Sequence, residues 1–531
     1  MIKNINMKYI ILHVIFICCS MAKAASFVHP GLLHNNEDLY RIENLVKNEV
    51  YPSYGSFKLL KGKNEASFYY QLKGPFKNIA RAGEYGYTKE PCENDFKAAY
   101  YNSLMWSITK NELHADKAME ILRAYAGKLK KIYGPDDPLC AGLQGFMLIN
   151  AAEIMRYTYS DLKYSNGWNL NDTKQVESMF RNVFLPVLQT FIKSEPYSNG
   201  NWGISVNKMV MALGIFLDDK DLYNSAIDFF YNSVDNGSLP NYISETGQIQ
   251  ETGRDQAHCM LGLGCLAELC ECAWKQGDNL YGALDNRLYK GYEYLSKVNL
   301  GYNNVPYKVW KDATGKYCNW QTIGEAGIGE FRSVFEIAYN HYVYRCKIEM
   351  PYTEKVIKRI RPEGEGFTCD NPGFGTLLFY LGKPEKRKID GKIEEYLSES
   401  YQDWIFESPQ LKPVDNYFYI VNQGIKIKKT RISYDAGKYP YIEVKFLNFP
   451  EHKKKDWLRL SYSVRSAPEY WSFTEDNVVK KSDDIYIFDV RGSLSNNGTI
   501  FSSKKESITL LLDFGDIKGI GIDYIISKKE L

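Results

Sequence analysis

The pattern of hydrophobic and polar positions differs between the first and the last part of the chain. Up to about residue 385, apolar residues recur at every third or fourth position, as one buried face of an α-helix requires. Loops rich in Gly, Asn and Pro separate these stretches, which therefore pair naturally as helical hairpins. The pattern predicts an all-α region over residues 25–385, with helices in Phe96–Ile108, Ala115–Ile132, Leu143–Tyr157, Val176–Ile192, Trp202–Leu217, Leu222–Val234, Ala257–Trp274, Leu284–Val298 and Ile328–Arg345.

After about residue 390, apolar and polar residues alternate with period two, as in Tyr439–Leu447 and Trp457–Val464. Gly, Asn and Asp punctuate these runs, which is typical of antiparallel strands joined by turns. The composition changes at the same place, since every Met and Cys lies at or before Cys369. We therefore expect a C-terminal antiparallel β-sandwich over residues 390–531, so that the fold is multidomain, with α and β parts.

The start of the chain has the features of a secretory signal peptide. Positively charged residues come first, the apolar stretch Tyr9–Cys19 follows, and Ala22-Lys23-Ala24 offers a cleavage site of small residues. We expect residues 1–24 to be removed and the mature protein to be secreted or periplasmic. No later apolar run is long enough to span a bilayer.

Composition narrows the choice of partners. The net charge is +2, so the chain lacks the basic field that nucleic acid binding requires. Aromatic residues reach 15%, with 42 Tyr, which suits a surface that stacks flat ligands such as sugar rings, although Tyr also fills cores. The chain has no P-loop, HExxH or GxSxG motif, and its Cys and His residues do not have metal-site spacing. We therefore predict no cofactor and no metal.

The densest group of polar residues surrounds His258, within the run from Gln248 to His258. A helix starting near Thr252 would place Arg254 and His258 four residues apart on one face. A neighbouring cation lowers the pKa of a histidine, which can then accept a proton, and an arginine can hold a carboxylate in a bidentate fork. Alternatively, the arginine caps a loop and the histidine is satisfied in the core.

Two further groups are candidates for contact with a sugar. Asn199 and Trp202 open the amphipathic helix Trp202–Leu217, where the asparagine either caps the helix or points its amide at a carboxylate, and the tryptophan could carry a sugar ring. Lys311 and Tyr317 lie in a loop rich in Lys and aromatic residues. A lysine beside a tyrosine lowers its pKa, so that the phenol could act as acid or base.

A fourth group contains Arg332 and His341. They lie nine residues apart, so on one helix they face different directions. A histidine in such a position belongs more often to the core or to the packing between helices than to a catalytic site.

Segments in order along residues 27–380 resemble the alginate-lyase-like polysaccharide lyases, with polysaccharide lyase family 38 as the closest match. The four segments that carry the resemblance are Phe27–His34, Lys117–Tyr125, Asn199–Trp202 with its continuation to Asp219, and Glu251–His258. The resemblance implies an (α/α) toroid for residues 25–385. It also implies β-elimination at a uronic acid of an anionic polysaccharide such as alginate or glucuronan, without a metal ion.

The resemblance also implies roles for individual residues. Asn199 and Arg254 would neutralise the uronate carboxylate, and Tyr317 would transfer the proton with His258 as its partner. Tyr302 and Tyr307 are close enough in sequence to compete with Tyr317. The chain departs from many alginate lyases in having Asn199 where they have His, and His258 near where they have Tyr. The expected substrate-binding residues are Trp202, Gln250, Glu251, Lys311, Arg332 and His341.

Two other functions fit the residues. An (α/α)-barrel glycoside hydrolase would need two carboxylates, for which Asp95, Glu251 and Asp255 are the first candidates. A non-catalytic glycan-binding protein could use the β-sandwich, where Trp404, Trp457 and Trp471 could line a sugar site. The pattern leaves the uronic acid, its linkage and the oligomeric state open.

Overall fold

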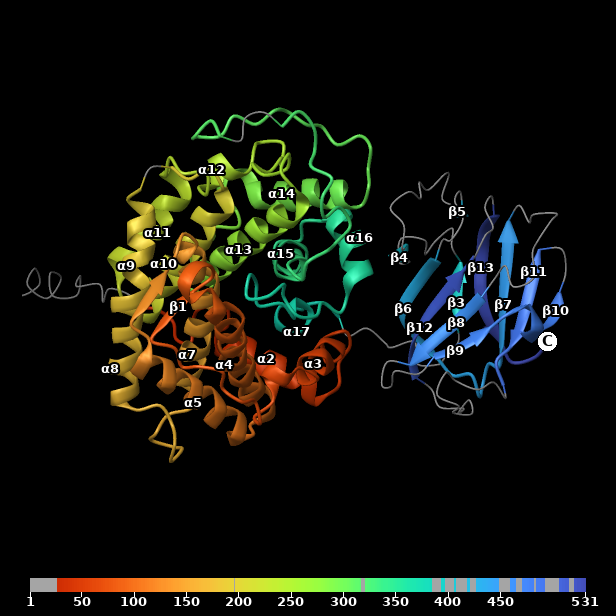
Figure 1. Ribbon diagram of the computed structural model, residues 1–531, viewed down its shortest axis with the longest axis horizontal. Coiled ribbons are helices and arrows are strands. Elements are labelled where there is room, and N and C mark those ends of the chain that lie inside the picture. The colour runs from red at the N-terminus through yellow and green to blue at the C-terminus, as the bar shows by residue number, and fades with distance from the viewer. Residues whose placement is uncertain are drawn as a thin grey trace, which may run out of the picture. The chain divides into compact units, whose positions relative to one another are not determined.

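The computed structural model divides the chain into two compact units, Met1–Pro384 and Glu385–Leu531 (Figure 1). In the first unit it describes residues 26–194, 196–316 and 320–383. In the second it describes residues 393–396, 405–406, 418–420, 426–447, 459–464, 470–481, 484–491, 506–514 and 520–531. The expected signal peptide at residues 1–24 lies outside the described residues.

The first unit is built from inner and outer helices (Figure 1). The inner helices α4, α10, α13 and α15 each pack against the outer helix that follows, α5, α11, α14 and α16 respectively, whereas the outer partner of α7 is α5. The inner helices neighbour one another in chain order, and almost every side chain of α10 and α13 is buried. Outer helices such as α5 bury one face only, as a helix between core and solvent does. The inner helices are α4 (Lys89–Thr109), α7 (Gly145–Thr158), α10 (Gly200–Phe216), α13 (Gln256–Lys275) and α15 (Phe335–Tyr339). The outer ones are α5 (Glu112–Lys128), α8 (Leu170–Met179), α9 (Leu185–Ile192), α11 (Lys220–Asn232), α14 (Ala283–Asn299) and α16 (Pro351–Ile360).

Short elements complete this unit. Strands β1 (Asn78–Ala80) and β2 (Lys131–Tyr133) form a parallel pair. The remaining helices are α2 (Asn36–Lys47), α3 (Ser53–Lys61), α6 (Asp137–Leu139), α12 (Leu239–Tyr242) and α17 (Gly375–Leu378), with the π-helical turns η3 (Cys140–Gln144), η4 (Phe180–Phe184) and η5 (Asn340–Arg345). The predicted α/α hairpins are thus confirmed. The stretch Asp137–Thr158 is long and apolar enough to cross a membrane, but 89% of its most apolar window is buried inside the unit, as in a core helix.

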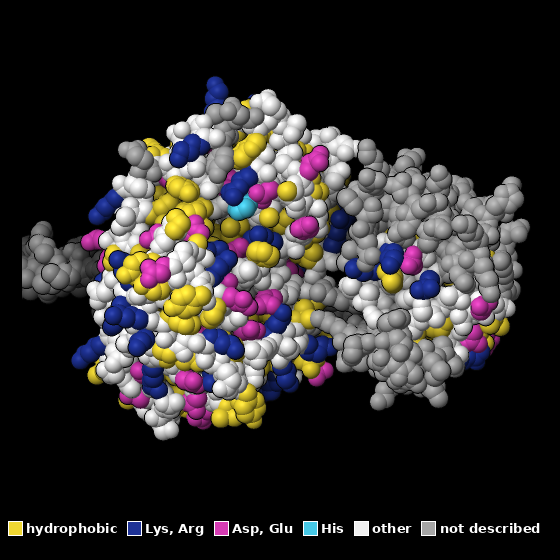
Figure 2. Space-filling model, viewed as in Figure 1, with side chains coloured by type: hydrophobic (Ala, Val, Ile, Leu, Met, Phe, Trp, Pro, Cys, Tyr) yellow, Lys and Arg dark blue, Asp and Glu magenta, His cyan; other side chains and the backbone are white. Residues whose placement is uncertain are grey.

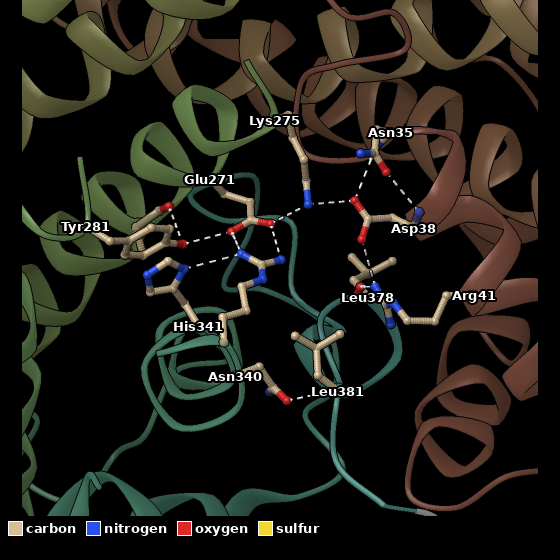
Figure 3. A network of polar contacts seen from close by, with 12 residues as sticks. Asn35, Asp38, Arg41, Glu271, Lys275, Tyr281, Asn340, His341, Leu378 and Leu381 are labelled. Carbon is tan, nitrogen blue, oxygen red and sulfur yellow. Dashed lines mark hydrogen bonds and ion pairs between the residues drawn. The ribbon is translucent and has the colours of Figure 1, made fainter. Parts of the chain in front are cut away.

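A buried network of charges joins the first helix of the unit to its last inner helices (Figure 3). Lys275, at the end of α13, reaches Asp38 of α2 and Glu271 at 2.6 Å each. Arg345 of η5 holds the same Glu271 through two hydrogen bonds of 2.8 Å. Burial alone would raise the pKa of Glu271, but Lys275 and Arg345 hold it well below its usual range. Arg41 of α2 donates to the carbonyl oxygen of Leu378 in α17, so the early and late helices are tied together.

The second unit contains two antiparallel sheets that share one core. One sheet has the order β10-β11-β7-β13-β3, with β5 also pairing with β13, and the other has the order β4-β6-β12-β8-β9. Alternate residues such as Ile442 and Val444 of β7 and Leu510 and Leu512 of β12 point into this core. The strands are β3 (Glu394–Tyr396), β4 (Ile405–Phe406), β5 (Phe418–Ile420), β6 (Lys426–Tyr434), β7 (Tyr441–Leu447), β8 (Arg459–Val464), β9 (Tyr470–Phe473), β10 (Val478–Lys481), β11 (Ile485–Asp489), β12 (Glu506–Asp513) and β13 (Ile520–Lys528).

The sandwich confirms the fold that the period-two pattern predicted. Trp471, one of the tryptophans considered for a sugar site, is only 5% exposed and belongs to the core instead. The large ring fills the space between the sheets, so it offers no face to a ligand. Trp404 and Trp457 lie outside the described residues.

We predict that Lys275→Met destabilises the helical unit. The change leaves Asp38 buried without the lysine that reaches it at 2.6 Å, and removing one partner of a buried ion pair costs about 3–5 kcal/mol. Lys290→Met is the control, because its partner Asp285 is 85% exposed and water screens such a pair, so its loss changes stability little. Thermal unfolding followed by far-ultraviolet circular dichroism should show a clear fall in Tm for Lys275→Met alone. Equal Tm values for the two variants would contradict the role of the network.

Candidate active site

The candidate site lies where α10 and α13 begin. Asn199 directly precedes α10, and Asp255 directly precedes α13. The N-terminus of a helix presents unpaired N–H groups and the positive end of the helix dipole, so this end of the unit favours anions. Figure 2 shows acidic and basic side chains gathered around a histidine in the middle of this face of the unit.

Glu251 is a fully buried carboxylate that connects the two helix starts. It accepts hydrogen bonds from the Asn201 side chain at 2.8 Å, from the Asn201 backbone at 3.2 Å and from the Tyr242 hydroxyl at 3.3 Å. Arg254 Nη1 donates to Oε1 of the same carboxylate at 2.8 Å. Glu251 has no exposed surface, so it positions Arg254 and does not contact a substrate, contrary to our expectation from the sequence.

Gln250 also has a positioning role in place of the predicted contact with substrate. Its Oε1 accepts from the backbone N–H of Gly200 at 3.1 Å, and its Nε2 donates to the carbonyl of Ser198 at 3.0 Å. The side chain is 1% exposed. Gln250 therefore holds the turn that presents Asn199.

Arg254, His258 and Asp255 form a chain of hydrogen bonds at the start of α13. Arg254 Nη2 lies 3.1 Å from His258 Nε2, and His258 Nδ1 lies 2.7 Å from Asp255 Oδ2. Because a guanidinium only donates, Nε2 accepts and the ring proton sits on Nδ1, where it is donated to Asp255. The side chains of Arg254 and His258 are 25% and 36% exposed, so both can be reached by a ligand. The four-residue spacing thus brings them together as predicted.

Asp255, which the sequence suggested only as an acid of a hydrolase, has two structural roles. Its Oδ1 accepts from the backbone N–H of His258 at 2.8 Å and so caps α13. Burial alone would raise its pKa, but the hydrogen bonds from His258 and the charge of Arg254 hold the pKa below its usual value. The carboxylate therefore stays ionised and orients the imidazole.

Asn199 does not cap α10, although it stands at the cap position. Its side chain makes no cap hydrogen bond, and its Oδ1 is buried without a hydrogen-bond partner in the part of the chain that the structure describes. An unsatisfied buried acceptor costs about 1–3 kcal/mol, which a hydroxyl of a bound sugar would recover. Trp202 follows it on α10, but the ring packs against Tyr197 at 4.6 Å between centroids and is partly buried.

The loop that carries Lys311 lies against these segments. The Asn236 side chain donates to the carbonyl of Tyr197 at 2.7 Å and accepts from the backbone of Ala313 at 2.9 Å. Gln248 forms two hydrogen bonds with the backbone of Lys308, at 2.7 and 2.9 Å. Lys311 is exposed on this anchored loop. Tyr317, our predicted proton-transfer residue, belongs to the same loop but lies outside the described residues.

Of the two competing tyrosines, Tyr307 lies beside the site and Tyr302 does not. The Tyr307 hydroxyl donates to the carbonyl of Trp320 at 2.8 Å, and burial raises its pKa. A Cβ atom at Gly253 would lie 2.5 Å from the Tyr307 hydroxyl and 2.5 Å from Cβ of Trp320, so the loop touches the residue before Arg254. The Tyr302 hydroxyl instead accepts from Lys355 of α16 at 2.6 Å.

His341 lies in the buried charge network and not with Arg254 and His258 (Figure 3). Its ring stacks on Tyr281 at 3.7 Å between centroids and is 1% exposed. Burial and the charge of Arg345 lower its pKa to about 3, so it stays neutral. Its two ring nitrogens face Arg345 and Cys346, at 3.4 and 3.2 Å, so His341 belongs to the packed interior and not to the substrate-binding surface predicted from the sequence.

The carboxylates considered for a hydrolase do not form an accessible pair. Asp95 is fully buried and accepts hydrogen bonds from the hydroxyls of Tyr70 and Tyr125 at 2.9 and 2.7 Å. Glu251 is buried in the same way, so the geometry offers no acid and base across an open cleft. Among the described residues, no group of three or more His, Cys, Asp and Glu is arranged to hold a metal ion.

Comparison with known proteins adds a resemblance to this geometry. Residues 52–301, which lie in the helical unit, match the family model for alginate lyase. The match supports a polysaccharide lyase enzyme, whereas the closer resemblance to family 38 stays a prediction. A comparison with curated protein sequences found no significant match.

Solved structures of alginate lyases are similar to the chain at low identity. One from Bacteroides ovatus is 12% identical, covers 67% of this chain and 100% of its own, and has a TM-score of 0.46. Alginate lyase A1-III from Sphingomonas species A1 is 11% identical, covers 65% of this chain and 95% of its own, and has a TM-score of 0.47. A variant of that enzyme was solved in complex with a tetrasaccharide, with 12% identity, the same coverage and a TM-score of 0.47.

We predict that Gly253→Ala displaces the loop from Tyr307 to Trp320. The new methyl group would lie 2.5 Å from atoms of both residues, which is too close for any relaxed contact. Limited digestion with trypsin should therefore cut faster at Lys308, Lys311 or Lys316. Gly127→Ala is the control, because nothing lies within 4 Å of a Cβ atom at that position on α5. Equal cleavage rates would show that the loop does not depend on this contact.

Proposed function

We propose that the chain cleaves a uronate-containing polysaccharide of the alginate or glucuronan type by β-elimination, without a metal ion. The family match supports a lyase. The observation that carries the proposal is the hydrogen-bonded chain of Arg254, His258 and Asp255 beside the unsatisfied Asn199 amide. These groups supply a guanidinium, an imidazole and an amide at the starts of neighbouring helices.

β-Elimination needs the uronate carboxylate to be neutralised, because only then is the C5 proton acidic enough to be removed. Arg254 and the Nδ2 group of Asn199 would donate to this carboxylate, and the N-terminal ends of α10 and α13 add to the positive potential. Glu251 holds Arg254 from behind, so the guanidinium keeps its orientation when the substrate arrives. Lys311, exposed on the neighbouring loop, is a further candidate for this role.

The proton transfer follows from the hydrogen bond between Arg254 and His258. In our proposal the substrate carboxylate takes over Nη2 of Arg254, which releases the lone pair of His258 Nε2. That lone pair accepts the C5 proton, the C5–H electrons form the C4=C5 double bond, and the C4–O bond breaks. A tyrosine of the loop, Tyr317 or the described Tyr307, protonates the leaving oxygen, and Asp255 stabilises the imidazolium that forms.

The alternatives receive less support from the site. A hydrolase requires two carboxylates that reach the substrate, and both Asp95 and Glu251 are buried. A histidine that is held in one tautomer beside an arginine is suited to proton transfer, a step that binding a glycan does not require. Secretion through residues 1–24 remains part of the proposal, since the substrate is an extracellular type of polymer.

We predict that incubation of the protein with alginate, polymannuronate, polyguluronate or glucuronan raises the ultraviolet absorbance for at least one of these polymers, because elimination creates a C4=C5 double bond. Arg254→Ala should lower kcat/KM by about 10²–10³-fold, as does the loss of one preorganised donor in other active sites. Arg181→Ala, which removes an arginine that is 43% exposed, should leave activity unchanged. New reducing ends without absorbance would indicate a hydrolase, and binding without either product would indicate a glycan-binding protein.

A further inference from the structure

Two further arginines, Arg81 and Arg332, lie at the same end of the helical unit as Arg254. Arg81 follows β1 and precedes α4, and Arg332 precedes α15, so both lie near the starts of inner helices. The backbone N–H of Arg332 lies 3.4 Å from the sulfur of Met260, which stands two residues after His258 on α13. Arg332 therefore lies against α13 close to His258, and the mechanism above uses neither Arg332 nor Arg81.

The two arginines share a single carboxylate. Asp370 Oδ2 accepts from Arg332 Nη1 at 2.9 Å, while Asp370 Oδ1 lies 3.9 Å from Arg81 Nη2. Arg81 Nη1 is buried and has no hydrogen-bond partner among the residues that the structure describes. Two guanidinium groups thus face one carboxylate, and one of them has unused donors. The unpartnered Nη1 of Arg81 could donate to a second carboxylate.

The neighbouring acid does not pair with this donor. Glu93 of α4 accepts a hydrogen bond from Gln144 at 2.7 Å. Burial raises the pKa of its carboxyl and the charge of Arg81 opposes that shift, but Glu93 forms no hydrogen bond with Arg81 Nη1. The missing partner of Arg81 is therefore best supplied from outside the chain.

An aromatic ring completes the surface. Phe367 is 57% exposed, and its ring centroid lies 4.3 Å from the guanidinium carbon of Arg332. The ring offers a flat apolar face directly beside a cation. Such a combination suits a uronate, whose ring carbons present an apolar face and whose carboxylate extends from it.

We propose that Arg81, Arg332 and Phe367 form a second uronate subsite, which binds a sugar near the one that undergoes elimination. This inference rests on the proposed function, since it names the substrate class of the same site. The subsite makes the enzyme selective for runs of uronates, because polymers that alternate uronate with a neutral sugar cannot fill both carboxylate positions.

The test compares Arg81→Gln with Lys77→Gln, which removes a charge from an exposed residue four positions away. Loss of a charge-assisted contact should raise KM for a homopolymeric uronate about tenfold or more, with kcat within about threefold of the wild type. KM for an alternating polymer should change much less, and Arg81→Lys should recover part of the loss. Phe367→Ala, at an exposed position, removes the apolar face of the subsite without changing Arg81 or Asp370, and should also raise KM.

Identical KM values for Arg81→Gln and Lys77→Gln would overturn the inference. A fall in kcat at constant KM would overturn it too, since Arg81 would then act in the chemistry or in folding. If the wild type produces no double bond with any polyuronate, the proposed function fails, and calorimetric titration with a tetrauronate still decides the subsite. Equal affinity of wild type and Arg81→Gln for that oligomer, or no affinity of either, refutes it.

Discussion

The candidate site depends on one buried carboxylate, that of Glu251. A charge with no exposed surface is stable only if every oxygen is paired, and its partners come from the start of α10, from α12 and from the turn before α13. Satisfying this one group therefore sets the separation of Asn199 and Arg254. The hydrogen bonds that stabilise buried Glu251 therefore also hold Asn199 and Arg254 in the positions from which they would contact the substrate.

The helical unit separates its structural charges from its functional ones. Lys275 and Glu271 lie near the C-terminal end of α13, where they bind Asp38 and Arg345 and are withdrawn from solvent. Arg254 and His258 lie at the opposite end of the same helix, where they remain partly exposed. Buried ion pairs thus join the helices at one end of the unit. At the other end, Arg254 and the N-terminal ends of the helices together create a positive potential that favours an anionic polymer.

Local pattern was enough to predict the parts of the site that follow from helix geometry. The four-residue spacing placed Arg254 and His258 together, because i and i+4 share a face in any α-helix. The same pattern could not separate residues that touch substrate from residues that position others. Glu251 and Gln250 look accessible in a polar run, but their partners come from residues 198–201, about fifty positions earlier. Asp370, which faces both Arg81 and Arg332, carries no local signal at all.

The two-part architecture, the helical hairpins, the alternating strands and the face shared by Arg254 and His258 all follow from the amino-acid sequence. These features depend on periodicity and on neighbours within a few residues, so they can be predicted along the chain. The packed fold was needed to show that His341 is buried in the core, that Glu251 supports Arg254 and that Asp370 lies between Arg81 and Arg332. Burial and pairing between distant segments are properties of the packed chain, because no local interaction specifies which surface the fold leaves open.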